Sequence, residues 1–323
     1  MMADVEPMQR NVDPAFRADV LAGLAAPIPA IPARWFYDHR GSELFEEITR
    51  LPEYYPTRTE TALLERYSAE IAARVGTGEA VIELGSGSSA KTPLLLRAVR
   101  PSAYVPVDIS GDFLRESAAA LQREMPDLPI YPVEADFTRP FDLPAEVREA
   151  AKLGFFPGST IGNFVARSGV DLLRAMKETL GDGARLVIGM DRIKDVDTLV
   201  RAYDDAAGVT AAFNLNLLHR INRELEADVP VDAFRHRAIW NDALSRIEMH
   251  LEAVRDIAFT ICGRRFAFRA GETIHTENSH KYGHRDSRIL LRAAGWGVVA
   301  EWTDEREWFS ILLTEAEPTR FAP

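Results

Sequence analysis

The stretch Ala80-Val81-Ile82-Glu83-Leu84-Gly85-Ser86-Gly87 decides how the rest of the chain is organised. A short apolar run ends in an acidic residue and two glycines follow, which is typical of a buried strand that enters a tight loop before a helix. Glycine lets the backbone turn sharply and leaves room for a ligand beside the main chain, and the helix that follows offers unpaired N–H groups. The spacing Gly85-x-Gly87-x-x-Ala90 also fits the dinucleotide fingerprint, so a nicotinamide enzyme stays possible at this point.

Composition excludes several classes of protein. The 323 residues are 46% hydrophobic and 27% charged, with a net charge of −11, and no Lys/Arg cluster stands out, which argues against nucleic acid or an anionic membrane as a partner. No apolar run approaches the roughly 18 residues of a membrane span, and the first residues lack the apolar core of a signal peptide. We therefore expect a cytoplasmic protein.

Metal binding is not expected from the cysteine and histidine pattern. Cys262 is the only cysteine, which excludes an internal disulfide and a thiolate metal cluster. His275, His280 and His284 lie close together in the sequence, but without cysteine or an evident carboxylate such histidines are usually surface or turn residues. We expect no metal site.

Strands and helices alternate after the glycine loop. Further strands are expected at 103–107, 129–133, 152–156 and 185–190. Repeated βα units predict a parallel sheet with helices on both faces, and ligands of such sheets bind at the carboxyl ends of the strands. The residues at these ends are Glu83, Gly85, Asp108, Asp136 and Asn163.

The alternation then stops, which predicts a second domain. Residues 194–228 have a helical pattern broken by Gly208, and residues 234–279 alternate apolar and polar side chains as an antiparallel sheet does. Two final strands, 296–302 and 308–313, resemble the last two strands of the S-adenosylmethionine-dependent methyltransferase sheet.

The expected fold is therefore α/β: a Rossmann-like class I methyltransferase sheet, mostly parallel with a C-terminal antiparallel hairpin, and a second α+β substrate-binding domain. The cofactor domain is expected to be discontinuous, with residues 59–193 and 283–323, and the substrate-binding domain comprises residues 1–58 and 194–282. A capping box, Thr57-x-x-Glu60, is expected to open the helix that leads into the cofactor domain.

The strand-end carboxylates favour a methyltransferase over a nicotinamide enzyme. Asp108 could accept both ribose hydroxyls of either cofactor. Asp136-Phe137 follows the third strand, where methyltransferases place an acidic residue on the adenine amino group and an apolar residue over the ring. Glu83 before the glycines fits the acidic-x-Gly-x-Gly pattern of the same fold.

Longer motifs resemble one family, the L-histidine Nα-methyltransferases of ergothioneine biosynthesis. The resemblance begins near residue 15 and reaches the C-terminus. It is carried by Trp35-Phe36-Tyr37-Asp38, residues 51–60, Glu83-Leu84-Gly85-Ser86-Gly87, residues 158–163, residues 201–214 and Glu277-x-Ser279-x-Lys281.

The resemblance implies a role for particular residues. S-adenosylmethionine would be held by Gly85, Lys91, Asp108, Asp136 and Phe137. The substrate would be held by Tyr54, Asn163, Tyr203, Met249, Glu277 and Ser279. Tyr37, Asn163 and the Gly158 carbonyl would lie at the reacting amine. One departure from the family pattern is His250, where an aromatic residue such as tryptophan is expected.

These residue types suit trimethylation of an α-amino group. A nitrogen must be neutral to attack the sulfonium methyl group, and neutral tyrosines and an amide hold an amino acid without favouring the ammonium. Glu277 could accept the imidazole N–H and Ser279 could donate to the bare nitrogen, since residues two apart on an extended segment point to the same side.

The expected reaction converts L-histidine, through its mono- and dimethyl forms, to Nα,Nα,Nα-trimethylhistidine (hercynine). The substrate is thus a small molecule, and we expect a monomer without nucleic-acid or membrane partners. Three alternatives are an Nα-methyltransferase of another amino acid, a nicotinamide-dependent oxidoreductase, and a non-catalytic module that senses the nucleotide.

Overall fold

A mostly parallel sheet organises one lobe of the protein. The computed structural model describes residues 13–87 and 91–318, and in these residues the strand order of the large sheet is β11-β12-β5-β4-β1-β2-β3. The parallel strands are β1 (Ala80–Leu84), β2 (Ala103–Asp108), β3 (Val133–Glu134), β4 (Lys152–Phe156) and β5 (Arg185–Asp191). The antiparallel hairpin consists of β11 (Trp296–Thr303) and β12 (Phe309–Ala316), and β12 pairs with β5. The predicted fold class is confirmed.

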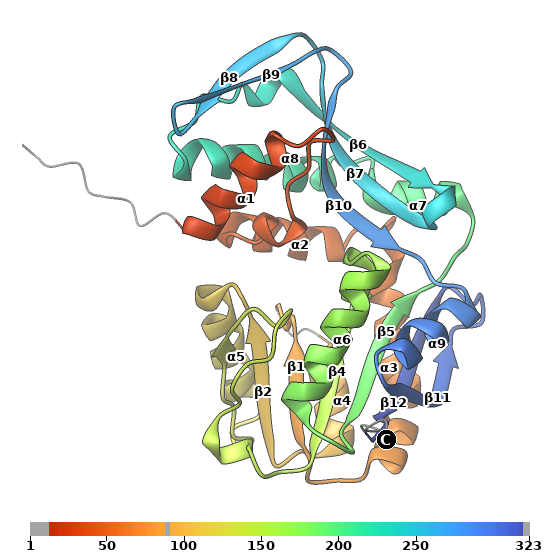
Figure 1. The fold of residues 1–323 in the computed structure, drawn as a ribbon. Helices are drawn as coiled ribbons and strands as arrows, with labels where there is room; N and C mark the ends of the chain where they lie inside the picture. The colour runs from red at the N-terminus through yellow and green to blue at the C-terminus, as the bar shows by residue number, and fades with distance from the viewer. Residues whose placement is uncertain (1–12, 88–90, 319–323) are drawn as a thin grey trace, which may run out of the picture.

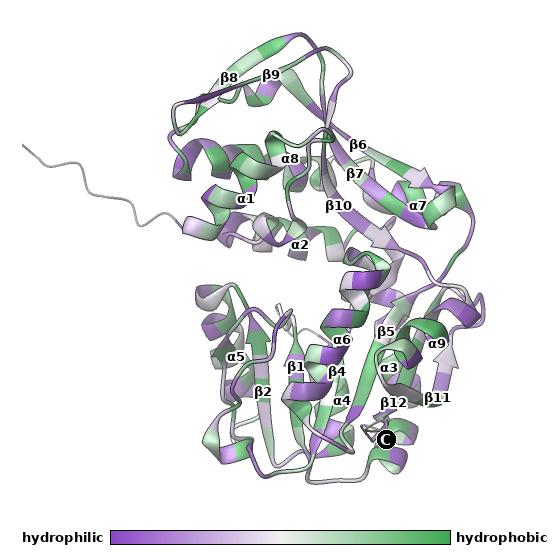
Figure 2. Ribbon diagram, in the orientation of Figure 1, coloured by the Kyte–Doolittle hydropathy of each residue, from purple (hydrophilic) through white to green (hydrophobic). Residues whose placement is uncertain are grey.

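Helices cover both faces of this sheet. They are α3 (Tyr55–Val75), α4 (Thr92–Val99), α5 (Gly111–Glu124), α6 (Ala166–Leu180) and α9 (His284–Ala293). Alternate strand residues reach opposite faces: Val81 packs with the leucines of α3 and α4, whereas Ile82 packs with those of α6 and α9. Burial on both faces explains why β1 is mostly apolar rather than alternating. Its one acidic residue, Glu83, is buried and accepts hydrogen bonds from the hydroxyls of Thr92 and Tyr104. Figure 2 shows these strands as the most hydrophobic part of the lobe.

The second lobe is built from two distant parts of the sequence. Its helices are α1 (Pro14–Leu24), α2 (His39–Thr49), α7 (Val196–Tyr203) and α8 (Val209–Glu224). Its strands form a sheet of β6 (Phe234–Asn241), β7 (Arg246–Ala253) and β10 (Thr273–His280), and a hairpin of β8 (Ile257–Ile261) and β9 (Arg264–Phe268). One hydrophobic cluster joins residues 16–55 to residues 199–274.

The two lobes face each other across the carboxyl ends of the parallel strands. In Figure 1 the arrowheads of β1 and β2 point towards α2 and the sheet of the second lobe. The chain crosses between the lobes after β5 and again after β10, and the two crossings touch: Arg192 forms a bridge with Tyr282. This arrangement supports the predicted division at residues 193 and 283, which stays a prediction.

Two local predictions differ from the structure. The third strand is only Val133–Glu134, with an isolated bridge between Tyr104 and Ile130, because prolines at 129 and 132 supply no N–H groups for a ladder. The capping box at Thr57 is wrong: α3 begins at Tyr55, its N-cap residue Tyr54 makes no side-chain capping bond, and Glu60 is buried elsewhere.

Two further comparisons concern histidines and membrane spans. His275 and His280 lie in β10 and are half-buried, so the expectation of surface or turn positions is wrong for both.

Among the helices of the described residues, none has the length and apolar character needed to cross a membrane.

Candidate active site

The glycine loop after β1 lies against Phe137. Gly85 has a φ of +69°, and a Cβ at this position would lie 3.5 Å from the ring of Phe137. The Gly85 N–H donates to Val107 O at 2.8 Å, and the Gly87 N–H donates to the Asp108 carboxylate at 3.1 Å. The loop, Asp108 and Phe137 are thus adjacent, as a nucleotide site requires; Ala90, the last position of the dinucleotide fingerprint, lies outside the described residues.

The two carboxylates expected at the nucleotide have different partners. Burial raises the pKa of Asp108, although backbone N–H groups of Ser110 and Gly87 oppose this shift. Asp136 accepts bonds from the Thr138 hydroxyl and N–H, and its other oxygen lies 3.5 Å from Arg34 Nη1. Arg34 also pairs with Asp19 at 2.7 Å, so the second lobe touches the expected adenine-binding carboxylate.

Lys91 is held by Glu60, the residue that local sequence alone assigns to a capping box. The Glu60 carboxylate is 1% exposed and forms an ion pair with Lys91 Nζ. The same carboxylate accepts the Gly158 N–H with both oxygens, at 3.0 and 2.9 Å. Glu60 therefore joins α3, the cofactor residue Lys91 and the loop that carries the Gly158 carbonyl.

Three tyrosines of the second lobe and its borders gather near Glu277. Burial raises the pKa of Tyr37, Tyr54 and Tyr203 well above the usual tyrosine value, and Glu277 adds to the rise for all three. Asp108 also raises the pKa of Tyr37, so Tyr37 lies between the expected cofactor and substrate groups. All three hydroxyls remain neutral at physiological pH.

Aromatic rings surround these hydroxyls. The ring centroids of Tyr54 and Tyr203 are 6.0 Å apart, and Phe45 lies 5.7 Å from Tyr37 and 6.3 Å from Tyr54. Faces of aromatic rings attract cations, including quaternary ammonium groups. The walls of this site therefore suit a methylated amine.

A bulge in β10 aims Glu277 into the site. Glu277 pairs with Met249, and His275 pairs with His250, which leaves Thr276 as the extra residue. The Thr276 hydroxyl lies 2.8 Å from Asn214 Oδ1 and 3.0 Å from Met249 O. Because Met249 and His250 are neighbours on β7, the bulge puts Glu277 with Met249 on one face and His275 with His250 on the other. The unusual His250 is thus directed away from Met249.

The carboxyl group of Glu277 has a raised pKa. Burial raises its pKa to about 7, and Lys281 opposes the shift. Ser279, two residues further on, shares a hydrogen bond of 2.6 Å with the Tyr203 hydroxyl. Glu277, Ser279 and Met249 thus occupy the positions that the sequence predicts for an imidazole pocket, and their roles stay a prediction.

Asn163 lies on a turn that is packed tightly against the same strand. A Cβ on the preceding Gly162 would lie 2.8 Å from His280 O, so only glycine permits this approach. The Asn163 amide makes no hydrogen bond with another described residue, and it is half-buried. It is therefore available to a ligand from the side of the sheet lobe.

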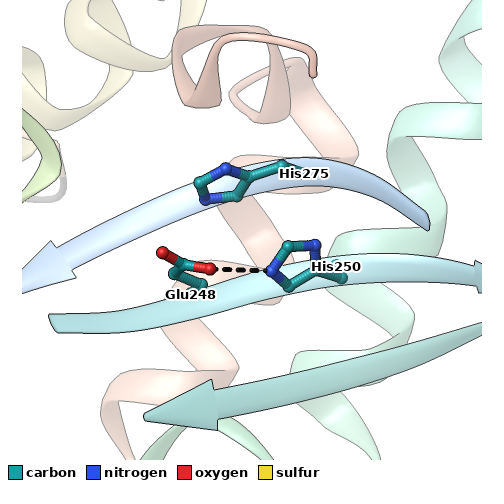
Figure 3. Close-up of side chains that lie close together, drawn as sticks. All are labelled: Glu248, His250 and His275. Atoms are coloured by element: carbon teal, nitrogen blue, oxygen red, sulfur yellow. Dashed lines mark hydrogen bonds and ion pairs between the residues drawn. The ribbon is translucent and has the colours of Figure 1, made fainter. Parts of the chain in front are cut away.

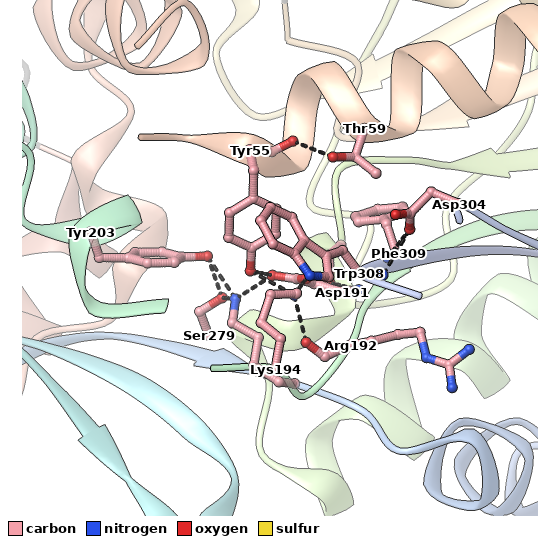
Figure 4. Close-up of polar contacts among 12 residues, drawn as sticks. Tyr55, Thr59, Asp191, Arg192, Lys194, Tyr203, Ser279, Asp304, Trp308 and Phe309 are labelled. Carbon is pink, nitrogen blue, oxygen red and sulfur yellow. Dashed lines mark hydrogen bonds and ion pairs between the residues drawn. The ribbon is translucent and has the colours of Figure 1, made fainter. Parts of the chain in front are cut away.

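A buried ionic network, which the sequence did not predict, lies behind the site (Figure 4). Asp191 ends β5 and accepts bonds from Lys194, Lys281 and, at 2.6 Å, the Tyr55 hydroxyl. The two lysines lower the pKa of Asp191 despite its burial. Burial lowers the pKa of Lys194 to about 8. The only sequence signals were Asp191 at a strand end and Lys281 within a motif.

Glu248, His250 and His275 form a second polar cluster, on the other face of the strands (Figure 3). Their donor atoms lie within 4.8 Å of one another, the two imidazole rings stack at 4.7 Å, and His250 Nε2 donates to Glu248 at 3.1 Å. Burial lowers the pKa of both histidines.

The chemistry of this cluster suits an ion pair better than a metal. Glu248 Oε1 already accepts Arg246 at 2.8 Å and Asn241 at 2.9 Å. Metal binding through His250 Nε2 would move its proton to Nδ1, which is buried and has no partner among the described residues, whereas metal-bound histidines normally donate that N–H. The expectation of no metal stays a prediction.

The fold defines a class. The antiparallel β12 between β5 and β11 does not occur in the all-parallel dinucleotide-binding order. A parallel sheet that ends in such a hairpin is the architecture of an S-adenosylmethionine-dependent methyltransferase.

The chain belongs to the family of histidine-specific, S-adenosylmethionine-dependent methyltransferases, whose family model matches residues 16–316. It is 43% identical over 305 residues to a histidine N-alpha-methyltransferase of Mycolicibacterium smegmatis, covering 93% of this chain and 94% of that protein. A histidine N-alpha-methyltransferase of Mycobacterium tuberculosis is 44% identical over 308 residues, with 93% and 94% covered. Ergothioneine biosynthesis protein 1 of Neurospora crassa is 29% identical over 297 residues, which are 88% of this chain and 33% of that protein.

Proposed function

We propose that the protein transfers methyl groups from S-adenosylmethionine to the α-amino group of L-histidine, three times in succession, to give hercynine for ergothioneine biosynthesis. The observation that carries the proposal is a cluster of buried hydroxyls: the rings of Tyr54 and Tyr203 lie 6.0 Å apart, and Ser279 Oγ lies 2.6 Å from the Tyr203 hydroxyl. Glu277 acts electrostatically on Tyr37, Tyr54 and Tyr203, and Asp108 acts on Tyr37. The site thus has hydroxyls for an amino acid, a carboxylate for its side chain and a nucleotide site next to both.

The cofactor residues fit S-adenosylmethionine. Asp108 would accept the ribose hydroxyls, Asp136 the adenine amino group, and Phe137 would cover the ring beside the Gly85 loop. Lys91, which Glu60 holds beside Gly158, would bind the methionine carboxylate. The bound cofactor supplies an electrophilic methyl group on a sulfonium.

The protein has to present a neutral amine. Tyr54, Asn163 and Tyr203 would hold the substrate carboxylate and amine, with Tyr37 and the Gly158 carbonyl at the amine. The nearby carboxylates of Glu60 and Asp191 are each neutralised by lysine, so neither would stabilise the unreactive ammonium. The aromatic walls would accept the added methyl groups.

The imidazole would be selected by hydrogen-bond complementarity. Glu277 would accept its N–H, the Ser279 hydroxyl would donate to its bare nitrogen, and Met249 would pack beside the ring. We further infer that the enzyme works as a cytoplasmic monomer on small molecules alone, in keeping with its acidic net charge of −11.

Mass spectrometry of the twenty amino acids incubated with the protein and S-adenosylmethionine tests the proposal. Histidine should gain three methyl groups on its α-nitrogen, and no other amino acid should do so at a comparable rate. Trimethylation of another amino acid in preference to histidine would refute the substrate assignment.

A variant then tests the pocket. Glu277→Ala should lower kcat/KM for histidine roughly 5- to 150-fold, because an imidazole N–H left unpaired costs about 1–3 kcal/mol. S-adenosylmethionine affinity should not change, and discrimination against phenylalanine and tryptophan should relax. An unchanged histidine preference would remove Glu277 from the pocket.

A further inference from the structure

Lys281 has a buried ammonium group whose donors are all used. Its side chain is 0% exposed and pairs with Asp191 Oδ2 at 2.8 Å. Nζ also donates to Tyr203 Oη at 2.9 Å and to Ser279 Oγ at 2.8 Å. An ammonium has three N–H donors, so these three contacts fix its position and leave none for a ligand.

These contacts determine which protons the two hydroxyls can offer. Tyr203 Oη and Ser279 Oγ share one hydrogen bond of 2.6 Å, which uses one of their two hydroxyl protons. Lys281 donates to both oxygens, so neither hydroxyl proton can be directed at the lysine. Tyr54 is a further hydrogen-bond partner of Tyr203. With Tyr54 and Lys281 donating to Tyr203, the Tyr203 hydroxyl donates to Ser279, and the Ser279 proton is left for a ligand. The Tyr203–Ser279 pair is therefore a single hydrogen-bond donor, and its donor atom is Ser279 Oγ.

Lys281 also acts on the acceptor side of the pocket. Burial raises the pKa of Glu277 to about 7, and Lys281 is the group that opposes this rise. The other titratable groups that sense Glu277 are Tyr37, Tyr54 and Tyr203, which are neutral. Among the described residues, the charge that favours the ionised, proton-accepting form of Glu277 comes from Lys281.

We propose that Lys281 is a positioning residue that sets the hydrogen-bond polarity of the side-chain pocket, making the Tyr203–Ser279 pair a donor and Glu277 an acceptor. This inference rests on the proposed function, since a neutral imidazole presents one N–H and one bare nitrogen. Lys281 does not touch the substrate; it prepares the two groups that do.

The chain offers a matched control in Lys194. Lys194 and Lys281 are both buried ammonium groups on Asp191, but Lys194 donates to Tyr55 and to Arg192 O instead of the pocket hydroxyls. Lys281→Met and Lys194→Met therefore each leave Asp191 with one lysine. Only Lys281→Met removes the donor to Tyr203 and Ser279.

The experiment measures steady-state methylation of histidine across pH, with calorimetry for S-adenosylmethionine. Lys281→Met should raise KM for histidine roughly 5- to 150-fold, the effect of leaving one imidazole nitrogen without its hydrogen bond, with a smaller change in kcat and unchanged cofactor affinity. The acid limb of kcat/KM should move to higher pH, because Glu277 loses its stabilising charge. Lys194→Met should keep the wild-type KM and acid limb. Free histidine titrates in the same way in every profile, so a difference between two profiles comes from the enzyme.

Two further variants separate a positioning role from a structural one. Lys281→Gln keeps a neutral donor, so it should restore part of the histidine affinity but still show the shifted acid limb, and it serves if Lys281→Met does not fold. In a Ser279→Ala background, Lys281→Met should cause a smaller loss than in the wild type, because the two act on the same ligand contact.

The outcomes distinguish this inference from the proposed function. If the wild type does not trimethylate histidine, the proposed function fails. If it does, and the Lys281 variants keep the wild-type KM and acid limb, the positioning role is refuted. Equal losses in Lys194→Met and Lys281→Met would also refute it, because they would show that only the charge balance at Asp191 matters.

Discussion

At the residue scale, the raised pKa of Glu277 makes the stability of the folded protein depend on pH. The native pKa is about 7 instead of the ordinary 4.5, so the folded protein binds a proton more tightly than the unfolded chain. The stability of the wild type should therefore fall as pH rises from about 4.5 to about 7. The acceptor that we propose for an imidazole N–H is thus a desolvated carboxylate, which is a common conflict between function and stability.

Glu277→Gln removes that ionisable group. It should raise the free energy of unfolding by about 1–3 kcal/mol at about pH 8, where Glu277 is ionised, and have little effect at about pH 4.5. Urea unfolding at the two pH values measures the difference, and the exposed Glu178→Gln is the control. A gain of the same size at both pH values would contradict the assigned titration.

A second residue-scale prediction concerns Asp108. Asp108→Ala should weaken S-adenosylmethionine binding roughly 10- to 150-fold, because about 1.5–3 kcal/mol is lost per charged hydrogen bond to the ribose. Calorimetry measures the affinity. Asp112→Ala is the control, since this carboxylate is 86% exposed and pairs with Arg115 on the helix surface; unchanged affinity in Asp108→Ala, or tight binding of NADH by the wild type, would count against the cofactor assignment.

At the scale of elements, the contact between the 160–163 turn and β10 holds the two halves of the site together. Gly162→Ala would place a Cβ 2.8 Å from His280 O, so the turn and the strand must separate, at a cost of about 1–3 kcal/mol. Since Asn163 and Ser279 flank this contact, KM for histidine should rise as well.

A second glycine provides the comparison. Gly169 lies within α6, where a Cβ would meet Ile161 at an ordinary 3.5 Å, so Gly169→Ala should stabilise the protein by up to about 1 kcal/mol through helix propensity. Chemical denaturation and histidine kinetics of the two variants decide the matter. Equal behaviour of the two would show that the close approach at Gly162 is unimportant.

At the scale of the whole molecule, the sheet depends on the end of the chain. β12 forms hydrogen bonds with β5 and β11, so residues 59–193 alone would expose β5 as an unpaired edge and should not fold cooperatively. Ile193 N lies 3.4 Å from Tyr282 O, so a short linker should join residue 193 to residue 283 without strain.

A shortened protein, in which residues 59–193 are linked to residues 283–323, should therefore unfold cooperatively and bind S-adenosylmethionine without methylating histidine. Circular dichroism during urea unfolding and calorimetry measure both properties. Cooperative unfolding and cofactor binding by residues 59–193 alone would show that the predicted discontinuous domain is wrong.

The sequence by itself determined the architecture. A buried apolar strand before Gly85, carboxylates at successive strand ends and a change to period-two alternation after residue 234 are local signals, because strand and helix periodicities follow from backbone geometry. The family resemblance then named the residues predicted to form the pocket, including Glu277 and Ser279. Conversely, the capping-box prediction for Glu60 failed, since a local motif cannot compete with a buried ion pair to Lys91.

Only the tertiary structure determined the ion pairs of the site and the pKa of Glu277. Asp191, Lys194 and Lys281 meet because the chain leaves the sheet lobe after β5 and returns to it after β10, and no local pattern encodes that meeting. The bulge at Thr276, which places the side chains of His275 and Glu277 on opposite faces of the sheet, likewise depends on pairing with β7. The raised pKa of Glu277 arises from burial, which Lys281 opposes, and that burial exists only in the folded protein.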